Sequence, residues 1–292
     1  MLIESHEPDW LSKVNNQVSE SLADHPDSSA YALLDLAFAP QCFEQLVTQR
    51  SALRYQGLYD RSPRPDPLLS SVSPTLIELT PETDTEWKRV LEHSNGWPML
   101  SIFVTPESLD ELAERLSAWC IVDADGTEFV LRFADTRRLP DIVSSLTPQQ
   151  HGQLFGPAYA VMCRSRAAQW TSLPLPQVPQ AAATHVKFAK AQVIALISAS
   201  EPDEMLDVLR RDEPSLLAEH SPAAAYEVVC NALDGAGRYG IDGYDRIRWC
   251  GVMLTNPDIE REPAAAGLLE TLSKGAAVYA DIHGRLNGLA AR

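Results

Sequence analysis

The dipeptide Asp125-Gly126 constrains the fold of this chain more than any other local feature. It stands between two apolar runs, 120–124 and 127–133. Asp-Gly between strand-like runs is the strongest short signal for a β-hairpin, because a type I′ turn needs a positive φ angle at both central residues. We therefore expect a hairpin that lies at the centre of the main sheet, with its second strand leading into a charged stretch, 132–138.

That charged stretch contains Arg132, Asp135, Arg137 and Arg138. Arginine forks bind carboxylates and phosphates through paired hydrogen bonds, so three interpretations compete. The cluster could be a structural lock in which Asp135 holds the arginines and fixes the exit of the hairpin. It could be a contact surface for an acidic or backbone-rich partner, which is compatible with a lock. It could also be an anion or phosphoryl site of an enzyme.

Two motifs resemble the core of the adaptor-chaperone family that serves bacterial type VI secretion and loads toxic effectors onto the VgrG spike. They read LRFADTR at 131–137 and LFGP at 154–157. The family pattern has an aromatic residue where this chain has Ala134, and a proline where it has Thr136. The positions of Arg132, Asp135 and Arg137 follow the pattern. The resemblance covers about 31–164, and a looser one covers the helical stretch 236–254.

The resemblance implies a cytoplasmic adaptor or chaperone that performs no chemistry. Its partners would be a cognate effector protein, bound through the N-terminal segment of that effector, and the VgrG spike protein. Phe155, Tyr239 and Tyr244 would then join the arginine cluster as residues that either bind a partner or lock the fold.

Strand-like and helix-like segments alternate through about residue 117, which predicts an α/β sandwich with a mixed sheet, in the α+β class. The first strand, 31–37, contains one charge, Asp35, which we expect to cap a loop or to pair with an arginine. Thr105 should begin a helix as its N-cap, with Pro106 at the first helical position. No glycine-rich loop follows the first strand, so a dinucleotide-binding or P-loop fold is disfavoured.

The rest of the chain separates into four parts. Residues 1–30 form an N-terminal extension whose apolar residues, beginning at Trp10, have the spacing of a short packed helix. The α/β adaptor domain covers 31–170. A proline-rich, semi-rigid linker covers 171–184. An all-helical C-terminal lobe covers 185–292, with helices predicted at 185–200, 201–212, 222–239, 243–255, 263–272 and 274–289.

The formal net charge is −16, and neither half of the chain is basic. This disfavours binding to nucleic acid and to anionic membranes. The five cysteines are odd in number and lack CxxC spacing, so we expect buried free thiols in a reducing compartment, without a metal. We see no secretory signal and no apolar run of about 18 residues, and we expect a cytoplasmic protein.

No catalytic residue or cofactor is expected from the sequence. A serine hydrolase would need a strand-turn-helix nucleophile such as GxSxG, which does not occur, and nothing pairs a cysteine with a histidine. Two alternatives to the adaptor stay open. One is an enzyme that handles an anion or phosphate with Arg132 and Arg137, and the other is a regulatory protein-binding module unrelated to secretion.

Overall fold

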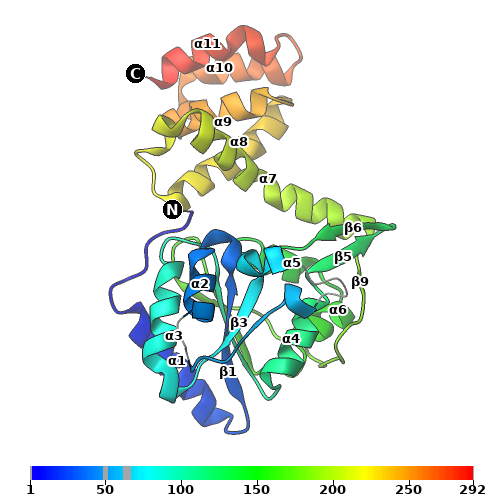
Figure 1. Cartoon of the computed structure of the whole chain (residues 1–292). Coiled ribbons are helices and arrows are strands. Elements are labelled where there is room, and N and C mark those ends of the chain that lie inside the picture. Colours follow the sequence, from blue (N-terminus) through cyan, green and yellow to red (C-terminus); the bar gives the residue numbers. More distant parts are fainter. Residues whose placement is uncertain (1, 49–51, 62–66, 292) are drawn as a thin grey trace. The chain divides into compact units, whose positions relative to one another are not determined.

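The computed structural model describes residues 2–48, 52–61 and 67–291, and it divides into two compact units, Met1–Ser198 and Ala199–Arg292 (Figure 1). The strands are β1 Ser29–Asp35, β2 Tyr55–Gly57, β3 Pro74–Glu78, β4 Leu100–Thr105, β5 Ile121–Ala124, β6 Thr127–Val130, β7 Ala160–Arg164, β8 Trp170–Ser172 and β9 Val186–Lys187. The α-helices are α1 Trp10–Asp24, α2 Gln41–Thr48, α3 Asp84–Leu91, α4 Leu109–Ser117, α5 Leu139–Ser145, α6 Pro148–Phe155, α7 Lys190–Asp212, α8 Pro222–Tyr239, α9 Asp245–Thr255, α10 Pro263–Ser273 and α11 Tyr279–Ala290.

The first unit is built on a six-stranded sheet of order β2-β3-β1-β4-β7-β8, in which the described pairings are antiparallel. Side chains alternate across β1: Tyr31 and Leu33 enter one hydrophobic core, and Ala32 and Leu34 enter the other. Helices α4, α5 and α6 cover the first face, and α1, α2 and α3 cover the second (Figure 1). The predicted α+β class, with an N-terminal sheet sandwich followed by a helical part, is confirmed.

The Asp125-Gly126 hairpin is confirmed, but its predicted place in the main sheet was wrong. Both turn residues have positive φ angles, 51° and 82°. Strands β5 and β6 pair with each other and, through a parallel β5–β9 contact, form a separate three-stranded sheet. A central strand must bury both faces, as β1 and β4 do, whereas Ile121 and Val130 of the hairpin are exposed.

The helix predicted from Thr105 begins later, at Leu109. Thr105 is the last residue of β4, and Ser108 is the N-cap. Ser108 and Glu111 form a capping box, in which each side chain hydrogen-bonds the backbone N–H of the other residue. This reciprocal pair satisfies two helix-end donors at once, so it fixes the helix start more strongly than the Thr-Pro signal.

The segment predicted as a linker, 171–184, lies within the first unit. Strand β8 pairs with β7, and the backbone N–H of Gln180 donates to the carbonyl of Gly152 at 3.2 Å. Strand β9 occupies the start of the predicted helix 185–200, and α7 then runs through Pro202 as one helix where two were predicted. In the second unit, α8, α9, α10 and α11 pack around a core that includes Trp249.

The N-terminal helix α1 buries Trp10, Val14 and Val18, as its spacing predicts. Ahead of it, the backbone N–H of His6 donates to the side chain of Asn95 at 2.7 Å, and His6 Nε2 lies 3.2 Å from Ser94 Oγ. None of the helices within the described residues is long and apolar enough to cross a membrane.

We expect His6 to make the folded state sensitive to acid. Burial, together with the positive charge of Arg164, lowers the pKa of His6 from 6.5 to about 4. The unfolded chain therefore takes up the proton first, and stability should fall as the pH drops from about 6.5 through 4. His6→Phe removes this titration, so urea unfolding at pH 7 and at pH 4.5 should show a smaller loss of stability than in the wild type. Equal losses would contradict the assignment.

Candidate functional site

The predicted charge cluster forms a lock at the exit of the hairpin. The Asp135 side chain is almost fully buried, and Arg137 donates to it from Nε at 3.1 Å and from Nη2 at 2.8 Å. The backbone N–H of Arg137 adds a third hydrogen bond to the same carboxylate. Arg138 is the N-cap residue of α5, and its backbone N–H donates to the Asp135 carbonyl at 2.9 Å. One buried carboxylate thus fixes the turn that starts α5.

Asp35 joins this lock from the end of β1. One of its carboxylate oxygens accepts the backbone N–H of Ala37, and the other accepts Arg132 Nη2 at 3.0 Å. Both predicted roles, loop cap and arginine partner, are confirmed. The same Arg132 nitrogen lies 3.8 Å from Asp135 Oδ2. Burial raises the pKa of Asp35, and the neighbouring Arg132 guanidinium opposes that shift.

Phe38 completes the cluster, and sequence reasoning missed it. The guanidinium carbons of Arg132 and Arg137 lie 4.8 Å and 5.6 Å from its ring centroid. Phe38 in turn stacks on Trp97 at 6.1 Å between centroids. The available signal was the position of Phe38 in the apolar stretch directly after Asp35, where an aromatic face can hold an arginine.

The departure from the family pattern at Thr136 has a structural counterpart. The backbone N–H of Thr136 donates to the carbonyl of Pro98 at 2.8 Å, a bond that proline could not make. The N–H of Asp35 donates to the carbonyl of Met99 nearby. The lock therefore joins the end of β1, the segment before β4 and the hairpin exit.

The predicted site residues differ in what they offer to a partner. The side chain of Arg137 is 6% exposed, whereas that of Arg132 is 46% exposed. Phe155 is fully buried and packs near Phe103, with ring centroids 6.2 Å apart, so its side chain acts in the core. Within the first unit, Arg132 is the predicted residue best placed to touch another protein.

A second buried ion pair, which was not predicted from the sequence, lies beside Gly156. Arg115 of α4 donates to Glu107 from Nε at 2.9 Å and from Nη2 at 2.6 Å. Its Nη1 donates to the carbonyls of Gln153 and Gln180, each at 2.9 Å. Arg115 therefore ties α4 to α6 and to the proline-rich segment. The available signal was a charge beside the apolar face of a helix, three residues after Leu112.

Tyr239 and Tyr244 belong to the second unit, apart from the arginine cluster. Tyr239 is half-buried and meets Trp249 edge-on, with centroids 6.2 Å apart. Burial raises the pKa of the Tyr239 hydroxyl. Tyr244 is 63% exposed, and the guanidinium of Arg248 lies 5.2 Å from its ring centroid. Tyr239 is thus mainly a packing residue, and Tyr244 is an accessible aromatic.

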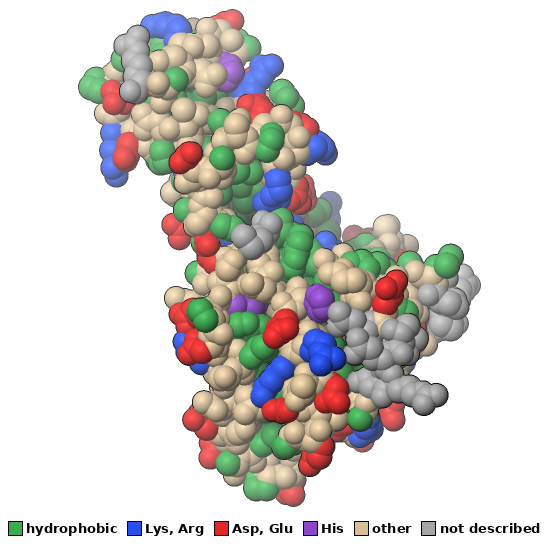
Figure 2. Space-filling model, turned by 60° about the vertical axis from the view of Figure 1, so that its left-hand side comes forward, with side chains coloured by type: hydrophobic (Ala, Val, Ile, Leu, Met, Phe, Trp, Pro, Cys, Tyr) green, Lys and Arg blue, Asp and Glu red, His purple; other side chains and the backbone are tan. Residues whose placement is uncertain are grey.

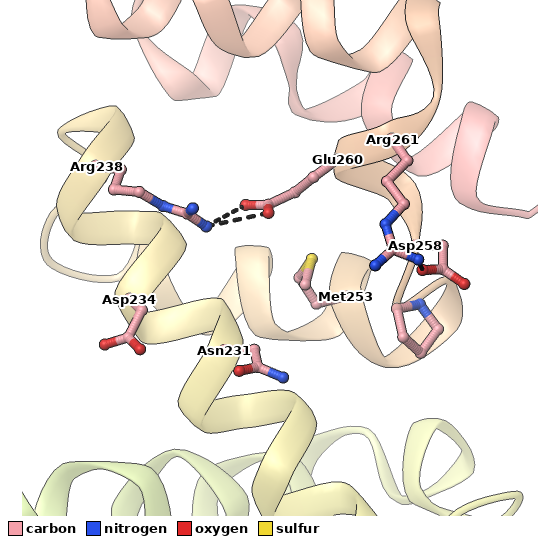
Figure 3. Close-up of a pocket in the computed structure, with 8 residues that line it drawn as sticks. Asn231, Asp234, Arg238, Met253, Asp258, Glu260 and Arg261 are labelled. Carbon is pink, nitrogen blue, oxygen red and sulfur yellow. Dashed lines mark hydrogen bonds and ion pairs between the residues drawn. The ribbon is translucent and has the colours of Figure 1, made fainter.

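A pocket of about 490 Å³ lies in the second unit (Figure 3). Arg238 of α8 reaches Glu260, and its Nη2 lies 3.0 Å from both carboxylate oxygens. Gly235 permits this approach, because a Cβ atom there would lie 2.8 Å from Glu260 Oε1. The pocket is lined by Asn231, Asp234, Arg238, Met253, Pro257, Asp258, Glu260 and Arg261.

The cysteines are mainly interior residues, and the surface charges are of both signs (Figure 2). Cys42, Cys120, Cys163 and Cys250 are buried, and burial raises the pKa of each thiol. Over residues 2–48, 52–61 and 67–291, no group of three or more His, Cys, Asp or Glu side chains could hold a metal ion. On the face in Figure 2, Lys and Arg side chains are scattered among Asp and Glu side chains.

Comparison with known proteins bears on the first unit. Residues 30–153 match the model of a family described as a domain of unknown function, DUF4123. This range includes the core strands β1 and β4, the hairpin and the arginine lock. No match was found among curated proteins or among solved structures.

The lock predicts unequal costs for its members. Asp135→Asn removes the buried negative charge that the Arg137 fork binds, and should lower the free energy of unfolding by about 3–5 kcal/mol. Arg132→Ala breaks a half-exposed pair and should cost about 1 kcal/mol or less. Urea unfolding of both variants tests this difference. Equal costs would show that Arg132 belongs to the buried lock.

Gly156 should be irreplaceable because of Arg115. Its φ angle is 52°, and an added Cβ atom would lie 2.4 Å from the guanidinium carbon. Gly156→Ala should cost about 3 kcal/mol or more, from backbone strain and overpacking together. Gly126→Ala is the matched control: its φ angle is 82°, but nothing lies within 4 Å, so about 1–2 kcal/mol is expected. Thermal unfolding that ranks the two equally would contradict the close contact.

Proposed function

We propose that this protein is a non-enzymatic cytoplasmic adaptor that binds a cognate type VI secretion effector and helps to load it onto the VgrG spike protein. The matched family is associated with adaptors of such effectors, and the match includes the arginine lock. The motif residues Arg132, Asp135 and Arg137, on which the resemblance depends, form one connected cluster. The effector's N-terminal segment would be the part that is bound.

The observation that most supports binding over chemistry is the orientation of the arginines. The Arg137 fork is occupied by Asp135, and Arg132 donates to Asp35. A phosphate or carboxylate substrate would have to displace these carboxylates from the positions that it would need. The cluster is therefore better suited to hold a protein surface in shape than to capture an anion. This argues against the anion-handling enzyme.

A regulatory binding module unrelated to secretion is the remaining alternative. It would share the fold and the lock, because both follow from packing and not from the identity of a partner. The identity of the bound protein is what separates the two. An adaptor should retain one large effector, with or without VgrG, whereas a regulatory module should retain neither.

The experiment is an affinity purification of the tagged full-length chain from its own host, with co-purifying proteins identified by mass spectrometry. Recovery of an effector or VgrG in stoichiometric amount is expected. Recovery of neither across a range of salt concentrations would overturn the proposal.

Two arginine variants sharpen this experiment. Arg132→Ala should reduce effector recovery severalfold. Arg54→Ala is the matched control, because Arg54 is also exposed and pairs with the more buried Glu78 at 2.9 Å, as Arg132 pairs with Asp35 at 3.0 Å. The control should retain the effector. If Arg132→Ala binds as the wild type does, Arg132 acts only in the fold.

A further inference from the structure

The outer edge of the hairpin strand β6 is open. The small sheet has the order β6-β5-β9, so β6 has a neighbour on one side only. In the described parts of the chain, no other strand pairs with its outer edge. An open edge presents unpaired backbone donors and acceptors, which can pair with a strand of another protein.

The register identifies which backbone groups face this edge. The N–H of Leu131 donates to the carbonyl of Cys120 at 3.1 Å, which makes 120 and 131 a hydrogen-bonded pair. Hydrogen-bonded and non-hydrogen-bonded pairs alternate along an antiparallel ladder. The pairs Ile121–Val130 and Asp123–Glu128 are therefore of the second kind. It follows that the N–H and C=O groups of Glu128 and Val130 point away from β5, toward the open edge.

The two faces of the hairpin differ in their side chains. On the inner face, Val122 is buried, and its partner Phe129 packs against the same core. On the outer face, Ile121 and Val130 lie opposite each other and are 48% and 57% exposed. An edge protected only against aggregation would place charges at these positions. The exposed apolar pair instead offers contact area to an added strand.

The charges on the outer face form a row that stops at the edge. Lys187 of β9 is the cross-strand neighbour of Asp123, which is the neighbour of Glu128. Asp123 and Glu128 are like charges directly opposite each other, which is destabilising. Residues 121–130 contain Asp123, Asp125 and Glu128 and no lysine or arginine. A basic side chain on an added strand, beside Glu128, would continue the row with the opposite charge.

We propose that β6 is the docking edge for an extended segment of a partner protein, which adds as a fourth strand to the small sheet. The segment has an apolar residue beside Val130 and a lysine or arginine beside Glu128. Because 128 and 130 are two residues apart, the apolar and basic residues of the segment are also two apart. The inference deepens the proposed function, on which it rests, since the effector would provide this segment.

The backbone part of the proposal is tested first on the full-length chain, by hydrogen exchange. Amides of Phe129 and Leu131, which face β5, should exchange slowly, and those of Glu128 and Val130 should exchange fast. Binding of a segment should slow the second pair. Equal protection of all four amides in the free chain would overturn the open edge.

The recognition part is tested with two labelled peptides, each of ten residues. One repeats Thr-Val-Thr-Lys and the other Thr-Val-Thr-Glu, and fluorescence anisotropy measures their binding to the full-length chain. The lysine peptide should bind about tenfold more tightly than the glutamate peptide. Glu128→Lys should reverse this preference. Glu114→Lys reverses the charge of an exposed residue on α4 and controls for the change in net charge. This variant should keep the wild-type preference.

Val130→Pro tests the edge hydrogen bonds separately. It removes an N–H that points away from β5, so the hairpin ladder and the melting temperature should be kept, while both peptides bind at least about tenfold more weakly. No saturable binding of either peptide, or an unchanged preference in Glu128→Lys, would overturn the proposal. A dimer in sedimentation that Val130→Pro dissociates would also overturn it, since a second copy would then occupy the edge.

Affinity purification of the effector with the β6 variants separates this inference from the proposed function. If the wild type captures an effector and both Glu128→Lys and Val130→Pro capture it equally well, the docking edge is wrong and the adaptor function stands. If the wild type captures no effector, the adaptor function fails, and the peptide measurements decide on the edge alone.

Discussion

The buried carboxylate of Asp135 is the constraint on which the first unit depends. A charge taken out of water is costly unless it is paired and hydrogen-bonded, and Asp135 meets this condition through the Arg137 fork and the Arg137 backbone N–H. Arg132 then extends the network to Asp35 at the end of β1. The chain can satisfy these charges only when the hairpin exit, the end of β1 and the start of α5 are assembled together.

The Arg115–Glu107 pair is a second pair of buried charges in the first unit, and it too is joined by hydrogen bonds. Its guanidinium also binds two backbone carbonyls, one in α6 and one in the proline-rich segment. In this way the proline-rich segment, 171–184, is fixed within the first unit although its sequence is that of a spacer. Arg115 and Arg137 both bind groups in the interior, so the proposed recognition of a partner falls to groups at the surface, such as Arg132 and the edge of β6.

This division is compatible with the proposed role of holding another protein. The lock fixes where the hairpin leaves the core, and the hairpin carries an open backbone edge with an apolar pair and an incomplete row of charges. The second unit contributes an exposed aromatic, Tyr244, and a polar pocket braced by Arg238 and Glu260. Its hydrophobic core around Trp249 is a cluster separate from the two cores of the first unit.

Features governed by neighbours in sequence were predictable. They include the Asp125-Gly126 turn, the packed helix at Trp10 and the Asp135–arginine contact, because turn chemistry, helical spacing and adjacent charges act over a few residues. Asp35 was predictable too, since a charge in a buried strand needs a partner. Tertiary structure alone decided that the hairpin forms its own sheet, that Arg115 binds the carbonyls of Gln153 and Gln180 inside the unit and that β6 has an open edge. Each of these depends on which distant strand or helix arrives alongside, and local sequence does not encode that.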